Sequence, residues 1–117
     1  MSAWVFDVPL PPSVNRTRKV HWAGHRRHEA WRNTAGWHLR ANGQYKAAPR
    51  RLQRYELTIT LDRKQCRQDP DNPIKAAIDL LRALEIITDD SPKFAERIVV
   101  EWGAAPDGCR LQLRAVA

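Results

Sequence analysis

The chain has 117 residues, a net charge of +7 and a sequence pI of about 10.1. This length predicts a single domain over residues 1–117. No apolar run approaches the 18 residues of a membrane-spanning helix, and residues 1–10 lack the basic and apolar regions of a secretory signal, so we expect a cytoplasmic protein without a membrane partner. Cys66 and Cys109 are too few for a disulfide scaffold, and we expect both to be reduced thiols.

The positive charge is concentrated in the first half of the chain. Residues Asn15–Arg54 contain eleven lysines and arginines but one acidic residue, Glu29, whereas the remainder has nine basic and twelve acidic residues. This basic lobe favours contact with nucleic-acid phosphates over the alternative of an ordinary solvated basic surface.

The first half of the chain predicts one strand and one helix. Residues Trp4–Val8 fit a short strand that ends at a group of prolines. A helical period covers Arg26–Ala41 and ends at Asn42-Gly43. We expect its buried stripe to contain Ala30, Thr34, Trp37 and Ala41, with Trp31, Ala35 and His38 beside it. We therefore place Trp31 and Trp37 in the core and leave Trp22, in the preceding loop, as a possible DNA contact.

The second half predicts three strands and one helix. Strict alternation marks Tyr55–Leu61 as a strand, and Glu96–Trp102 and Cys109–Val116 fit two more. A polar loop leads to a helix with Asn72 as its N-cap and Pro73 in its first turn. The buried stripe of this helix is expected to be Ile74, Ala77, Ile78, Leu81 and Leu84. The element order predicts an α+β fold, a small mixed β-sheet with two helices packed on one face.

Five aspartates lie between residues 69 and 90 of this otherwise basic chain. Two carboxylates about 4 Å apart repel by roughly 4 kcal/mol at an effective dielectric near 20, so a fold that gathers three needs a cation. Oxygen ligands suit Mg²⁺, Mn²⁺ or Ca²⁺. Asp69 and Asp71 are two residues apart and can face one ion, and Asp90 joins them if the chain folds back. Alternatively, Asp71 complements the helix dipole and Asp89-Asp90 forms a polar turn.

Lys75 lies one helical turn after Asp71 and one turn before Asp79, so the three share a helix face. Beside a metal cluster, Lys75 would stabilise negative charge on a phosphate. The alternative is a surface ion pair between Lys75 and Asp79, worth a few tenths of a kcal/mol. For His21, His25 and His28 we expect phosphate contact or exposure in preference to a zinc site.

Two motifs carry a resemblance to a known family. Asp69-x-Asp71-Asn72-x-x-Lys75-x-x-x-Asp79-x-Leu81, followed by Ile86-Ile87-x-Asp89-Asp90, resembles the RusA-type Holliday junction resolvases of bacteria and their prophages. Pro11-Pro12-Ser13-Val14-Asn15 is similar to a segment that follows the first strand in this family. The resemblance covers nearly the whole chain. The Ser13–Arg54 region departs from it, because it is richer in Trp, His and Arg.

The resemblance implies a RusA-like homodimer that cuts four-way DNA junctions with Mg²⁺ in recombination and repair. It places the metal ligands at Asp69, Asp71 and Asp90 and the essential lysine at Lys75, and we expect Mn²⁺ to substitute for Mg²⁺. We expect DNA contacts from Asn15, Arg16, Arg18, Lys19, Arg26, Arg27 and Arg32. The alternatives are a non-catalytic nucleic-acid-binding module and a nuclease for other branched or single-stranded DNA.

Overall fold

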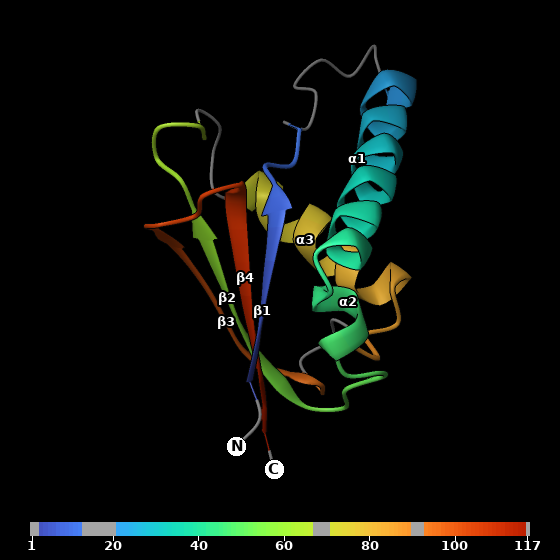
Figure 1. The fold of residues 1–117 in the computed structure, drawn as a ribbon, viewed down its shortest axis with the longest axis vertical. Helices are drawn as coiled ribbons and strands as arrows, with labels where there is room; N and C mark the ends of the chain where they lie inside the picture. The colour runs from blue at the N-terminus through green and yellow to red at the C-terminus, as the bar shows by residue number, and fades with distance from the viewer. Residues whose placement is uncertain (1–2, 13–20, 67–70, 90–92, 117) are drawn as a thin grey trace.

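The computed structural model describes residues 3–12, 21–66, 71–89 and 93–116, and only the backbone of residues 21–25, 71 and 72. The elements are β1 (Ala3–Pro9), α1 (His21–Ala41), α2 (Gln44–Ala47), β2 (Tyr55–Leu61), α3 (Asp71–Ala83), β3 (Ala95–Trp102) and β4 (Gly108–Ala115). All three helices lie on one side of a four-stranded sheet (Figure 1). The predicted α+β class with a mixed sheet is therefore confirmed, and α2 is a one-turn helix that the sequence did not predict.

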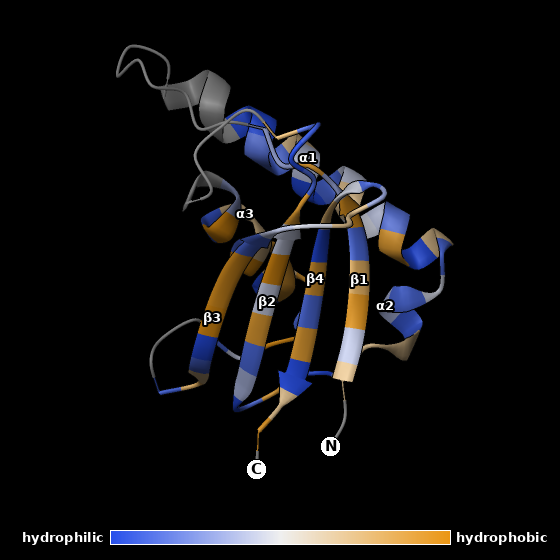
Figure 2. Cartoon of the chain, turned by 90° about the vertical axis from the view of Figure 1, so that its left-hand side faces the viewer, coloured by the Kyte–Doolittle hydropathy of each residue, from blue (hydrophilic) through white to orange (hydrophobic). Residues whose placement is uncertain are grey.

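The strand order of the sheet is β1-β4-β2-β3. β4 runs antiparallel to both of its neighbours, and β3 runs parallel to β2 at one edge, as Figure 2 shows from the side without helices. The parallel pairing follows from the connection between β2 and β3, because α3 carries the chain back to the start of the sheet. The face that the helices leave uncovered is called the open face below.

The core lies between the sheet and the helices. Alternate residues of β1, β2 and β4 face the helices, and Phe6, Leu57 and Leu113 are fully buried there. Leu57 and Leu113 are directly opposite in the register of β2 and β4, and this cross-strand packing is the unit that stabilises a sheet. Cys66 and Cys109 are both free thiols buried in the same region.

The buried stripe of α1 is different from the predicted one. Trp31, Ala35 and Leu39 are buried at a spacing of four residues, whereas Trp37 is 69% exposed. Ala30, Thr34 and Ala41 of the predicted stripe are also exposed, so that prediction was wrong, as was the core position of Trp37. The burial of Trp31 was correct, and its indole N–H donates a hydrogen bond to the carbonyl of Pro9 at 2.9 Å. This partner lets the large ring be buried without an unsatisfied polar group.

The two helix starts differ from the expected positions. α1 begins at His21, earlier than Arg26, and α3 begins at Asp71, so Asn72 lies inside the first turn and does not cap it. Pro73 is buried in that turn, where its missing N–H has no intrahelical partner to lose. Four of the five residues predicted to form the buried stripe of α3 are buried, and Ile74 is half-buried. No helix in the described ranges is long and apolar enough to cross a membrane.

Candidate functional site

The predicted metal ligands fall mostly where the structure gives no description. Asp69 and Asp90 lie outside the described residues, and Asp71 is described only as the first backbone position of α3. Within the described ranges, no three His, Cys, Asp or Glu side chains are grouped to hold a metal ion. Convergence of the three aspartates around one ion therefore stays a prediction.

The loop that leads to Asp69 begins with a fixed turn at Asp62. Its carboxylate accepts hydrogen bonds from the Gln65 side chain at 2.7 Å and the Lys64 backbone N–H at 3.0 Å. These two hydrogen bonds lower the pKa of the half-buried Asp62 carboxyl, and the bond from Gln65 has the larger effect. The N–H of Cys66 bonds to the Asp62 carbonyl at 2.8 Å. The chain therefore leaves β2 in a defined direction before it reaches residue 67.

The segment before Asp90 is anchored at its backbone. The hydroxyl of Tyr55, a fully buried side chain at the start of β2, donates a hydrogen bond to the carbonyl of Asp89 at 2.7 Å. One residue earlier, the N–H of Thr88 bonds to the carbonyl of Leu52 at 3.1 Å. The Asp89 carboxylate lies 3.7 Å from Nε of Arg82 near the end of α3. The backbone that enters position 90 is therefore held by both the sheet and a helix.

Asp71 and Arg82 occupy the first and the last turns of α3. They are eleven residues apart, which corresponds to a rise of about 16 Å along the helix axis. The anchor of Asp89 is thus at the opposite end of α3 from Asp71.

Lys75 is exposed on α3, and the ion pair that the alternative interpretation expected is absent among the described residues. The Asp79 carboxylate lies 3.9 Å from Nη1 of Arg82, on the next turn, and forms no ion pair with the ammonium of Lys75. Within the described ranges, no carboxylate neutralises Lys75. Its charge is available one turn after the start of the helix, where Asp71 lies.

The predicted DNA contacts are only partly described. Residues 15–19 lie outside the described ranges, whereas Arg26 and Arg27 are exposed on α1 and Arg32 is half-buried. The side chains of Trp22, His21 and His25 are also not described. His28 is half-buried, and its Nε2 atom is enclosed without a hydrogen-bond partner among the described residues, so this nitrogen is not an exposed phosphate contact.

A groove of about 370 Å³ runs between α1 and α3, and sequence reasoning did not find it. Arg32, Trp37 and Arg40 from α1 line it together with Leu80 and Leu84. The guanidinium of Arg40 lies 5.3 Å from the centre of the Trp37 ring and 4.9 Å from that of Tyr45. An exposed indole beside a guanidinium is a surface on which a nucleic-acid base can stack. The spacing of Trp37 and Arg40, three residues apart on a helix, was the available signal.

The chain matches no protein-family model, and no curated protein matches it. Its function is therefore inferred from its own residues.

Proposed function

We propose that this protein is a RusA-type, magnesium-dependent endonuclease that resolves four-way DNA junctions by paired, symmetric nicks. The observation that supports this best is the exposed Lys75, which no described carboxylate neutralises, one turn after the aspartate that begins α3. An ammonium that no described carboxylate neutralises can stabilise the negative charge of a phosphate.

Asp69, Asp71 and Asp90 are the proposed metal ligands, because three carboxylates provide the hard oxygen donors that Mg²⁺ prefers. When bound, the ion would activate a water and neutralise charge on the scissile phosphate. Lys75 would hold positive charge where the phosphate becomes most negative. Tyr55 would fix the backbone that carries Asp90, through its hydrogen bond to Asp89.

The DNA would be held by the basic lobe, residues Asn15–Arg54. Arg26 and Arg27 are exposed there, and phosphate contacts of this kind position a substrate without reading its sequence. Each neutralised phosphate should contribute about −0.9 to the slope of log affinity against log salt on duplex DNA. A two-fold homodimer would present its two active sites to two DNA strands that are related by the same symmetry. This arrangement would account for paired nicks.

The test is cleavage of a synthetic four-way junction with Mg²⁺, with Mn²⁺ in a parallel reaction. Asp90→Asn and Lys75→Ala should lose cleavage while they still bind the junction. Asp107→Asn, a loop carboxylate beside His38, is the matched control and should cleave normally. Equal cleavage by wild type and Asp90→Asn would remove Asp90 from the mechanism. Comparison with flaps and single strands tests whether another branched DNA is the substrate.

The second candidate is a non-catalytic nucleic-acid-binding module, which the exposed Trp37 and the groove beside it favour. Magnesium titration separates the two functions. A nuclease should nick the junction and show a metal affinity that Asp71→Asn weakens. A binding module should show neither effect, although it should bind the junction with the same salt dependence.

A further inference from the structure

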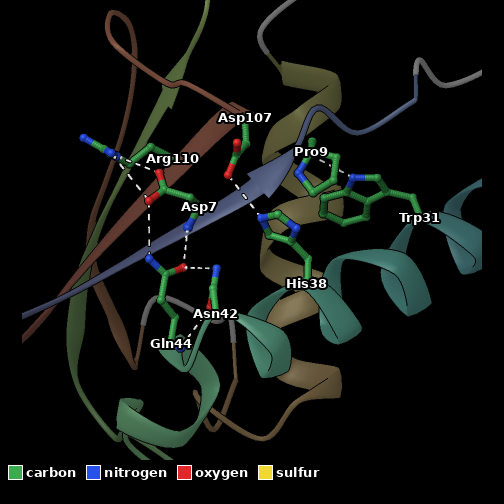
Figure 3. A network of polar contacts seen from close by, with 8 residues as sticks. All are labelled: Asp7, Pro9, Trp31, His38, Asn42, Gln44, Asp107 and Arg110. Carbon is green, nitrogen blue, oxygen red and sulfur yellow. Dashed lines mark hydrogen bonds and ion pairs between the residues drawn. The ribbon is translucent and has the colours of Figure 1, made fainter.

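The two edges of the sheet, β1 and β3, are protected very differently. On β1, the N–H of Asp7 donates to Oε1 of Gln44 at 2.8 Å, and the carbonyl of Pro9 accepts from the indole of Trp31 at 2.9 Å (Figure 3). Both groups point away from β4, so they are the groups that a further strand would need. Pro9 has no N–H to offer such a strand.

The cover on β1 is itself held in place by a polar network. Nε2 of Gln44 donates to the Asp7 carboxylate at 3.3 Å, and Asn42 donates to Oε1 of Gln44 at 3.1 Å. On the other side, Nε of Arg110 donates to Asp7 at 2.8 Å (Figure 3). The edge at β1 is closed by side chains from α1, α2 and the turn that joins them.

Among the residues that the structure describes, no comparable cover protects β3. It is eight residues long, contains neither proline nor lysine, and packs extensively only against β2. On its helix-side face Ile98 and Trp102 are 39% and 38% exposed, whereas Leu57 and Leu61, their partners on β2, are fully buried. A long edge strand that has an apolar face and no proline can pair with another strand, provided that the partner matches its charges.

We propose that β3 pairs antiparallel with β3 of a second copy of this chain, around a two-fold axis that passes beside Val99. When two identical strands pair antiparallel around a two-fold axis, the residue at the axis lies opposite the same residue of the other copy. A residue before the axis then lies opposite the residue that follows the axis by the same number of positions. With Val99 at the centre, Arg97 lies opposite Glu101 of the other copy, and Ile98 lies opposite Val100. The symmetry repeats both pairs.

The charges of β3 select this register over its neighbours. Centring the pair on residue 97 or 101 would set like charges against each other, and centring it on residue 98 or 100 would leave Arg97 and Glu101 without opposite charges. Arg97 and Glu101 are both exposed, and neither forms an ion pair with any described residue. Glu56, opposite Arg97 on β2, is already ion-paired with Arg114. The open face therefore carries two charges that a second copy can match.

The same register also covers Ile98, which is 39% exposed in the single chain. Ile98 and Val100 share the helix-side face of β3, so each covers the other across the axis. The result is a continuous eight-stranded sheet with the helices of both copies on one face. This pairing supplies the two-fold dimer on which the proposed paired nicks depend, but it is tested without DNA or Mg²⁺, so its failure is distinguishable from a failure of the nuclease proposal.

The first test is a charge swap followed by sedimentation. Arg97→Glu and Glu101→Arg each replace two attractive cross-strand pairs by two repulsive ones, so each should raise the dimer dissociation constant about tenfold or more. An equimolar mixture of the two variants restores both attractive pairs and should form a heterodimer. Lys46→Glu, an equal charge change on α2, should dimerise as the wild type does. A wild type that is monomeric at about 100 µM, single variants that dimerise normally, or a mixture that stays monomeric would each overturn the proposal.

The second test is a cross-link at the axis. Opposite residues of an antiparallel pair have Cα atoms about 4.5–5.5 Å apart, within the range that a disulfide spans. Val99→Cys should therefore give a disulfide-linked dimer under mild oxidation. Val5→Cys, at a 41% exposed position on β1, is the matched control and should stay largely unlinked. Cys66 and Cys109 are buried and should not compete. Equal linkage of the two variants, or none from Val99→Cys, would contradict the pairing.

Discussion

The indole nitrogen of Trp31 lies 2.9 Å from the carbonyl oxygen of Pro9, so the buried stripe of α1 and the outer edge of β1 share a hydrogen bond. The Trp31 side chain thereby packs in the core and also donates to a carbonyl that is not hydrogen-bonded to another strand. This hydrogen bond joins two residues that are 22 positions apart, on either side of residues 13–20, which the structure does not describe.

Trp31→Phe should lower the free energy of unfolding by about 1–3 kcal/mol. The phenyl ring keeps most of the packing, but the half-buried Pro9 carbonyl loses its donor. Urea denaturation measures the change. Trp37→Phe is the control, because an exposed aromatic of this kind should change stability by no more than about 0.5 kcal/mol. Equal losses in the two variants would show that the hydrogen bond contributes nothing.

Tyr55→Phe should affect both stability and metal use. It removes the donor to the Asp89 carbonyl from a fully buried ring, which should cost about 1 kcal/mol of stability. Because Asp90 follows directly, we also expect nicking to need more Mg²⁺ for half-maximal rate. Tyr45→Phe, at the other tyrosine of the chain, should leave the Mg²⁺ requirement unchanged. An unaltered requirement in Tyr55→Phe would separate this anchor from the proposed site.

Trp37→Ala should weaken binding to DNA with unpaired bases. Loss of one base–aromatic stack is worth about 1–3 kcal/mol, or roughly ten- to a hundredfold in affinity. Trp37→Phe keeps a stacking surface and should retain most of the affinity. Fluorescence anisotropy with a labelled single-stranded DNA measures both variants. Unchanged binding by Trp37→Ala would exclude the groove between α1 and α3 as a contact surface for bases.

Cys109 should make the protein less stable in alkaline solution. Burial, with smaller contributions from Cys66 and Asp7, raises the pKa of its thiol from 9.0 to about 12. Between these values the unfolded chain releases the proton and the folded chain keeps it, so stability falls as pH rises from 9 toward 12. The slope from this thiol approaches about 1.4 kcal/mol per pH unit. Urea midpoints from pH 8 to 11 should therefore fall more steeply for wild type than for Cys109→Ala, and parallel slopes would contradict this.

The sequence predicted helices and strands well where the hydrophobic pattern could be interpreted in only one way. The alternation from Tyr55 to Leu61 gave β2 with its observed bounds, and the apolar spacing of α3 gave four of its buried residues. For α1 the pattern was ambiguous, because Trp31 and Trp37 are six residues apart and lie about 120° apart around the helix. Only packing against β1, through Pro9, decides which of them faces inward.

The sequence predicted which residue types would form the candidate site, but it did not predict the contacts that position them. Aspartate spacing and the position of Lys75 follow from the chain, whereas the hydrogen bond from Tyr55 to Asp89 joins residues 34 positions apart with no local signal. The groove beside Trp37 was missed for a related reason, since it exists only where two helices distant in sequence approach. The exposed edge at β3 depends on strand order, which no single strand encodes.

The position of β4 also has a consequence for how the chain acquires its shape during synthesis. Within the four described strands, β1 bonds only to β4, and Arg110 reaches Asp7 across 103 positions of sequence. A nascent chain on the ribosome must therefore expose β1 and β2 as separate pieces until β4 emerges and inserts between them. Closing so long a loop is slow, so we expect the β-sheet to form late and a chain truncated before Gly108 to require chaperones.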